Sequence, residues 1–388
     1  MINLHCDAVI PDGPMKNVAE IEKSITTAYK KTIWSKFLKA VNDFDMVKDG
    51  DKIAIGVSGG KDSLLLAKLF HELKKDRRRN FEFKAVSLNP GFREDDLNNF
   101  KNNLKKLMKN KKYDVVIDFD MGLSKYIKMI NVNKKIAWVH ASIKNWYERE
   151  SRIARLGKRL QQYDNIVTIC DEMKEETGNL FPFLRNKLLR IYNPFNFDRI
   201  LNLSEEKVEN KYYDEDFIIA ISRLTTHQKD FLTLIKGFKR AKELSNIPEK
   251  LLILGDGPDR EKIEKMIRDE NMEKDIILLG SIKNPYPWLK KAKLFVHSSK
   301  YEGLPTVLIE ALVLNKKVIS SACPTGPKEI LENGRIGDLY EIGDYEKLTY
   351  YIIEALKNSS LDKELIEKEI QKFSKEEVIK EYERLILN

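Results

Sequence analysis

The chain has 388 residues, of which 33% are charged, and a formal net charge of +9. This length predicts two or three domains of about 100–200 residues each. The three cysteines (Cys6, Cys170 and Cys323) are far apart, so neither a disulfide framework nor a zinc site is expected. No apolar run is long enough to span a membrane, and the N-terminus lacks a secretory signal. We expect a cytoplasmic protein with nucleic-acid, membrane-surface or phosphorylated partners.

The first half of the chain alternates short β-branched runs with helical patterns. Strands are predicted at 53–57, 83–88, 115–117, 136–139 and 166–169. Helices are predicted at 63–75 and around the apolar residues Leu97, Phe100, Leu104, Leu107 and Met108. This alternation predicts a parallel sheet with helices on both faces.

The alternation restarts after 191–214, a polar segment that we predict to be a hinge. Strands are then predicted at 217–221, 251–254, 276–279, 294–296 and 317–320, and charged helices from Tyr345 onward. The fold class predicted is therefore α/β, with two successive Rossmann-like units.

Two carboxylates, Glu302 and Glu310, are eight positions apart around a predicted strand–helix junction. Between them lie Gly303, Leu304 and Pro305. Glu302 should lie in the loop after the strand, and Glu310 in a helix that begins near Thr306. In open α/β sheets ligands bind at this end of the strands, where a helix N-terminus also favours anions.

Cations and glycines follow two other strands of this half. Arg223 and Lys229 come after one strand, and two cations on one loop suit a diphosphate. Gly255 and Gly257 follow the next strand, where a glycine lets a ligand approach the backbone. Because the carboxyl ends of parallel strands meet at one edge, we expect these residues to lie near Glu302.

Together these motifs resemble the nucleotide-binding domain of retaining GT-B glycosyltransferases of the family four type. The resemblance includes the stretch 323–330, which looks like the cell-surface polysaccharide members, and extends back to about Tyr113. It implies two Rossmann-like domains facing a cleft and a hexosyltransferase that retains the anomeric configuration. It also implies a nucleotide-sugar donor, with uridine diphosphate as the commonest carrier, and neither a required metal nor a tightly bound cofactor.

The resemblance also implies roles for individual residues. Arg223 and Lys229 would hold the donor diphosphate, Glu310 the ribose, and Glu302 the donor sugar. The remaining donor-site residues would be Gly255, Gly257, Gly303 and Leu304. His140 stands at a predicted strand end, where the family often has a histidine facing the sugar; an ordinary strand-end histidine is the alternative.

The acceptor implied by the resemblance is a glycan or a lipid-linked molecule. Between 141 and 160 the basic residues are Lys144, Arg149, Arg152, Arg155, Lys158 and Arg159, and the acidic ones are Glu148 and Glu150. This stretch is predicted either as a helix on an anionic membrane surface or as a solvated helix. The protein would accordingly be peripheral on the inner face of the membrane or free in the cytoplasm.

A different motif stands near the N-terminus, between the strand at 53–57 and a helix. It consists of Ser58, Gly59, Gly60, Lys61, Asp62 and Ser63. Its glycines and backbone N–H groups suit phosphate, so ATP is a candidate ligand. The loop resembles the pyrophosphate loop of ATP-dependent enzymes, and about 15–92 resembles tRNA 2-thiocytidine synthetases. The paired cysteines of that family are missing here, which argues against tRNA as a partner.

Three functions therefore stand as hypotheses: a glycosyltransferase, an ATP-dependent enzyme of the tRNA thiolation type, and a non-catalytic nucleotide-binding hybrid. The first is favoured because its donor-domain motifs are complete. We expect a pyrophosphate-loop-like βαβ unit at 1–92 to open the first Rossmann-like domain, and 93–200 to complete it. We expect the donor domain at 201–370, and a helix at 371–388 that returns to the first domain.

Overall fold

The computed structural model describes residues 26–27, 29–43, 47, 50, 52–57, 69–70, 72–75, 80, 82–87, 114–119, 121–147, 149–358 and 360–387. The chain divides into two compact units. One consists of Met1–Asp118 and Lys128–Asn133, the other of Phe119–Ile127 and Lys134–Asn388. The predicted boundaries at 92, 200 and 370 stay predictions.

In the first unit, β1 (Lys52–Val57) pairs in parallel with β2 (Glu82–Ser87). Both strands fall where the sequence predicted them. The π-helix η1 (Lys30–Trp34) leads into α2 (Ser35–Asp43), and β3 (Val115–Asp118) lies further along the chain. A small buried core contains Val41, Val47, Phe70 and Leu73. The loop 58–63, most of the helix predicted at 63–75 and the helix predicted around 97–108 lie outside the described residues.

The second unit begins with three parallel strands, β4 (Lys134–Val139), β5 (Asn165–Thr168) and β6 (Leu188–Arg190). Its helices here are η2 (Gly122–Lys125), the start of η3 (Ile127–Met129), α5 (Ile143–Trp146), α6 (Glu150–Leu160), α7 (Asp171–Leu180), η4 (Pro182–Lys187) and α8 (Phe197–Leu203). The strands are short and apolar, as expected of parallel strands covered on both faces.

A second parallel sheet has the strand order β12-β11-β10-β7-β8-β9. Its strands are β7 (Phe217–Ile221), β8 (Lys250–Leu254), β9 (Ile276–Gly280), β10 (Leu294–His297), β11 (Val318–Ser321) and β12 (Asp338–Tyr340). The chain builds β7, β8 and β9 outward in one direction and then β10, β11 and β12 in the other. The order therefore reverses between β7 and β10, which is the topological switch point where α/β sheets bind ligands.

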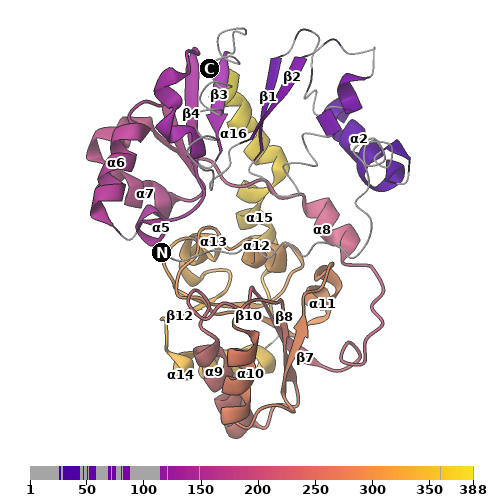
Figure 1. Ribbon diagram of the computed structural model, residues 1–388. Coiled ribbons are helices and arrows are strands. Elements are labelled where there is room, and N and C mark those ends of the chain that lie inside the picture. The colour runs from indigo at the N-terminus through magenta and orange to yellow at the C-terminus, as the bar shows by residue number, and fades with distance from the viewer. Residues whose placement is uncertain are drawn as a thin grey trace. The chain divides into compact units, whose positions relative to one another are not determined.

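The helices of this part are α9 (Phe231–Ser245), α10 (Arg260–Asp269), α11 (Tyr286–Lys291), α12 (Thr306–Val313), α13 (Pro327–Ile330), η5 (Glu332–Gly334), α14 (Tyr345–Lys357), α15 (Lys363–Ile370), η6 (Gln371–Phe373) and α16 (Lys375–Leu387) (Figure 1). Helix α9 begins where the Asp230 carboxylate accepts the N–H of Thr233, and it ends at Asn246, whose φ is 47°. Both ends follow the sequence rules for helix caps.

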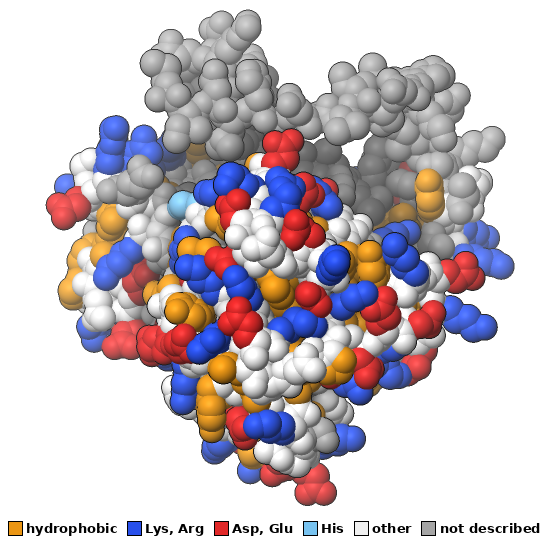
Figure 2. All heavy atoms as spheres, turned by 90° about the horizontal axis from the view of Figure 1, so that it is seen from below, with side chains coloured by type: hydrophobic (Ala, Val, Ile, Leu, Met, Phe, Trp, Pro, Cys, Tyr) orange, Lys and Arg blue, Asp and Glu red, His pale blue; other side chains and the backbone are white. Residues whose placement is uncertain are grey.

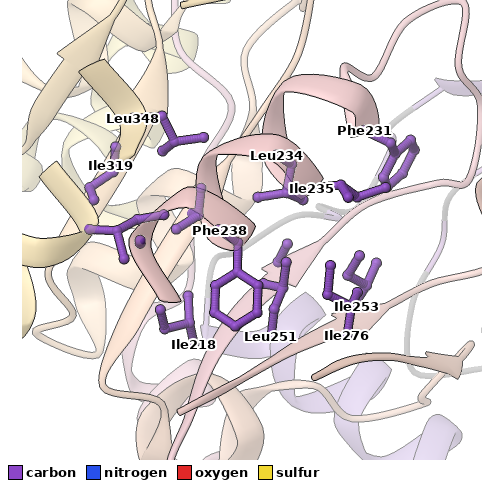
Figure 3. Packing of buried hydrophobic residues seen from close by; sticks show 14 of the residues in the cluster. Ile218, Phe231, Leu234, Ile235, Phe238, Leu251, Ile253, Ile276, Ile319 and Leu348 are labelled. Carbon is purple, nitrogen blue, oxygen red and sulfur yellow. The ribbon is translucent and has the colours of Figure 1, made fainter. Parts of the chain in front are cut away.

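The core of the second sheet lies between its strands and the helices α9, α10 and α14. Figure 3 shows Phe238 of α9 between Ile218 of β7 and Leu251 of β8. Helix α14 packs closely on α9 because Gly237 has no side chain: a Cβ there would lie 2.8 Å from Leu348. This packing fixes β7, and with it the loop that follows the strand.

The segment 191–214, whose role as a hinge stays a prediction, includes a helix that the sequence analysis did not predict. It contains α8, which the Asn196 side chain caps by accepting the N–H of Arg199 at 3.0 Å. Ile200 of this helix is buried. Further along, the ring of Tyr382 in α16 stacks on that of Trp138 in β4 at 4.9 Å between centroids.

Candidate active site

The loops after β7 and β10 join at the switch point. Lys229 and Ser299 form an antiparallel bridge, and the N–H of Lys300 donates to the carbonyl of Gln228 at 2.8 Å. These backbone bonds align two segments that are about seventy residues apart in the sequence. As a result, Lys229 and Glu302 face each other, as the motif analysis predicted.

The Glu302 carboxylate is held by four side chains. Lys229 Nζ forms an ion pair with its Oε1, which also accepts from Ser299 Oγ at 2.7 Å and lies 3.2 Å from His297 Nε2. Gln228 Nε2 donates to Oε2 at 3.2 Å. The side chains of Lys229 and Glu302 are only 11% and 9% exposed, so water screens the pair weakly.

Burial alone would raise the pKa of Glu302, but hydrogen bonds from His297 and Lys229 and the ammonium charge lower it to about 2. Burial lowers the pKa of His297, which keeps the ring neutral at neutral pH. Its Nδ1 lies 2.8 Å from Ser320 Oγ, so the ring is held from both sides. The site therefore presents an ionised, oriented carboxylate, which can stabilise a developing positive charge.

Glu310 lies in α12, which begins at Thr306 as predicted. Burial raises its pKa, and the opposing influence is the hydroxyl of Tyr286, which donates to Oε1 at 3.2 Å. Glu310 and its partner Tyr286 are thus separate from Glu302 and the four side chains that hold it.

Arg223 follows β7 with its side chain exposed. Across the described parts of the chain, none of the hydrogen bonds or ion pairs engages its guanidinium. A guanidinium on a loop at the switch point is therefore available to a ligand.

Gly255 and Gly257 are held close to the neighbouring loop. A Cβ on Gly255, whose φ is +135°, would lie 1.9 Å from the carbonyl oxygen of Ser222. A Cβ on Gly257 would lie 2.5 Å from that of Leu224. The structure thus gives these glycines a packing reason that the sequence analysis did not consider. Their contact with a ligand stays a prediction.

Replacing Gly255 by Ala should destabilise the protein by about 3 kcal/mol, because strain at positive φ and a backbone clash add together. Gly343→Ala is the matched control, since φ is +84° there and nothing lies within 4 Å of the added Cβ. It should cost about 1 kcal/mol. Denaturant unfolding of both variants measures the difference, and equal losses would contradict the packing argument.

The structure brings the backbone of His140 close to Gly303, the residue that follows Glu302. His140 follows β4, and a Cβ on Gly303 would lie 2.9 Å from its carbonyl oxygen. Its ring lies 4.3 Å from that of Phe119 between centroids. Leu304, next to Gly303, is buried.

Sequence reasoning missed four side chains that hold the two carboxylates: Gln228, His297, Ser299 and Tyr286. Three of them stand within seven positions of Lys229 or Glu302, which is the only signal that they carry in the sequence. Among the residues that the structure describes, no group of three His, Cys, Asp or Glu side chains could hold a metal ion. None of the described helices has the length and apolar character needed to cross a membrane.

Residues 203–372 match the family described as glycosyl transferases group 1. An uncharacterized glycosyltransferase of Methanocaldococcus jannaschii is 39% identical over 218 residues, which cover 54% of this chain and 53% of that protein. A poly(ribitol-phosphate) alpha-N-acetylglucosaminyltransferase of Staphylococcus aureus is 27% identical over 299 residues, which cover 73% of this chain and 58% of that protein. The chain spans little more than half the length of these two curated relatives.

The match to each of two solved structures extends over almost the whole length of the solved chain. The apo form of the lipopolysaccharide outer core galactosyltransferase WaaB has a TM-score of 0.65 and 18% identity, covering 87% of this chain and 99% of that one. HepE of Anabaena in complex with UDP has a TM-score of 0.64 and 14% identity, with the same coverage. The chain therefore has the GT-B fold, with parallel sheets in two Rossmann-like domains.

Within this fold, 203–372 is the segment that matches the group 1 glycosyl transferases, as the motifs predicted. The resemblance of 15–92 to tRNA 2-thiocytidine synthetases stays a prediction.

Proposed function

We propose that the protein is a retaining hexosyltransferase that uses a nucleotide sugar, with uridine diphosphate as the carrier. The observation that carries this proposal is the buried Lys229–Glu302 pair at the switch point between β7 and β10. This pair lies in the segment that matches the group 1 glycosyl transferases. The solved structure of HepE in complex with UDP supports the choice of carrier.

The acceptor that we propose is a cell-surface polysaccharide or a lipid-linked glycan. One relative is a poly(ribitol-phosphate) transferase, and another, from Campylobacter jejuni, is named for a diphospho-undecaprenol acceptor. That second relative is 27% identical over 192 residues.

In the proposed reaction the bond between the anomeric carbon and the phosphate oxygen of the donor breaks, and an acceptor hydroxyl oxygen bonds to that carbon on the same face. The hydroxyl proton passes to the departing diphosphate. Arg223 and Lys229 stabilise the negative charge that develops on the leaving diphosphate. Glu302, ionised at neutral pH, stabilises the positive charge that develops on the sugar. Glu310 binds the ribose hydroxyls, and His140 faces the sugar from the end of β4.

Thermal unfolding with UDP, GDP, ADP and ATP, each near millimolar concentration, tests this proposal first. A nucleotide present at about 100 times its Kd should add about 2.7 kcal/mol of stability. Stabilisation by UDP, followed by transfer from a UDP-sugar with the anomeric configuration retained, is the expected result. Stabilisation by ATP alone would refute the proposal and favour the loop at 58–63 as the working site.

We further propose that α6 rests on an anionic membrane surface. Its buried side contains Leu156, Gly157 and Leu160. Its basic residues Arg152, Arg155 and Lys158 are exposed, and none forms an ion pair with any described residue. Elsewhere the two signs of charge are mixed: Figure 2 shows Lys and Arg interspersed with Asp and Glu over the face seen from below. Phe181, which packs on the buried side of α6 at Gly157, is itself buried, and the neighbouring Phe183 is 53% exposed.

Vesicles that contain phosphatidylserine should therefore bind the protein, and purely phosphatidylcholine vesicles should not. Reversing the charge at Arg152, Arg155 and Lys158 to Glu should weaken binding by more than about a hundredfold, since each basic residue near the surface contributes about 1 kcal/mol and each new carboxylate is repelled. The matched control reverses the exposed residues Lys265, Arg268 and Lys274. Sedimentation at low and high salt measures binding, and equal losses in the two variants would favour the solvated-helix alternative.

A further inference from the structure

Helices α7 and α13 each provide a carboxylate to the N-terminus of the other. The Glu329 carboxylate of α13 accepts the N–H of Asp171, the first residue of α7, at 2.8 and 3.1 Å. In return, Glu172 of α7 accepts the N–H of Gly326, the residue before α13, at 3.2 Å. The two glutamates are 157 positions apart, so these bonds join distant parts of the chain.

These two sets of bonds satisfy N–H groups at the start of each helix. The first N–H groups of a helix lack partners within it, and negative charge is favourable there. Neither α7, preceded by Cys170, nor α13, preceded by Gly326, has a side-chain cap of its own. Glu329 is further fixed by the hydroxyl of Tyr192, which donates to its Oε1 at 2.6 Å.

The segment that Glu172 holds also supports the loop of Glu302. The N–H of Glu302 donates to the carbonyl of Pro324 at 3.0 Å, and the hydroxyl of Thr325 donates to the carbonyl of Glu302. A Cβ on Gly326 would lie 3.0 Å from the carbonyl oxygen of Gly303, so the two segments touch directly.

The opposite side of this loop contacts the residues that follow β4 and β5. Gly303 lies against the carbonyl of His140, and the thiol of Cys170, next to α7, lies 3.9 Å from the carbonyl oxygen of Gly303. The loop at 302–303 is therefore enclosed by the segments that the two glutamates join.

We infer that Glu172 and Glu329 are positioning residues, whose reciprocal bonds hold the Glu302 loop in register with His140 for sugar transfer. This inference rests on the proposed function. Neither glutamate touches the Glu302 carboxylate, so both act through the backbone of 324–326. A displacement near 1 Å at a reacting group can lower the rate about a hundredfold, so loss of these bonds can lower the rate of sugar transfer.

The kinetic test compares Glu172→Gln, Glu329→Gln and the double variant in UDP-sugar turnover. Each single variant should lower kcat at least on the order of tenfold, with the KM for the donor changed less than about twofold. The double variant should lose little more than either single variant, because the two bonds act as one unit. Glu175→Gln is the control: Glu175 lies on the same helix, is exposed, and has no side-chain partner among the described residues.

Amide hydrogen exchange gives a readout that does not need turnover. Exchange in peptides covering 300–305 and 322–328 should be about tenfold faster in both single variants and unchanged in Glu175→Gln. Unchanged exchange in both single variants would overturn the inference, as would unchanged kcat in an active protein. If exchange is faster in the two single variants but the wild-type protein transfers no sugar, the result would contradict the proposed function and leave the structural link supported.

Discussion

Replacing Lys229 by Met should lower the rate of sugar transfer on the order of 10²- to 10³-fold and destabilise the protein by about 3–5 kcal/mol. The first effect follows from the loss of a cation at the proposed diphosphate position. The second follows because Glu302, 9% exposed, would lose its ammonium partner and become a buried charge without a counterion. Initial rates with a UDP-sugar and denaturant unfolding at neutral pH measure the two effects.

The pH dependence of unfolding provides a check with a definite sign. The lowered pKa of Glu302 contributes stability that is present above the ordinary value of 4.5 and is lost as the pH falls through about 2. In Lys229→Met the pKa of Glu302 should rise. The difference in stability between the wild-type protein and the variant should therefore narrow as the pH falls.

Two further variants separate the buried pair from a general loss of charge. Lys265→Met removes a lysine whose ion pair with Asp269 is exposed, and it should change stability by less than about 1 kcal/mol. Adding Glu302→Gln to Lys229→Met should restore part of the stability while activity stays lost. A double variant as unstable as Lys229→Met alone would contradict the argument from the buried charge.

The sequence was sufficient to predict the positions of the long, apolar elements of the fold. The strands β7, β8, β9 and β10 and the start of α12 at Thr306 fall within about a residue of their predicted positions. Runs such as 217–221 are apolar at every position, and in a βαβ pattern such runs are typical of buried parallel strands. In contrast, β6 and β12 were missed because each has three residues, too few to show a pattern.

The candidate site could be predicted as a set of residues but not as a network. Arg223, Lys229 and Glu302 follow strands, so the topology of a parallel sheet brings them to one edge. The roles of His297 and Ser299 depend on which side chain points at Glu302, and this is decided by the register of the β7 and β10 loops. Within 191–214, whose role as a hinge stays a prediction, the polar residues around α8 hid this helix, whose cap is Asn196.

Arg223→Ala should lower kcat/KM with a UDP-sugar on the order of 10²- to 10³-fold, the usual cost of removing one group that stabilises charge in the transition state. In contrast to Lys229→Met, it should leave the free energy of unfolding within about 0.5 kcal/mol of the wild type, because the side chain is exposed. Arg223→Lys should recover activity only in part, since an ammonium keeps the charge but loses the two-pronged geometry that suits phosphate.

The matched control is Arg268→Ala, which removes an exposed arginine on α10 and should change neither kcat/KM nor the free energy of unfolding. Full activity in Arg223→Ala would show that the diphosphate is held elsewhere. A selective loss of activity in a stable protein would instead assign this guanidinium to the ligand, because no described residue is bonded to it in a way that could account for the loss.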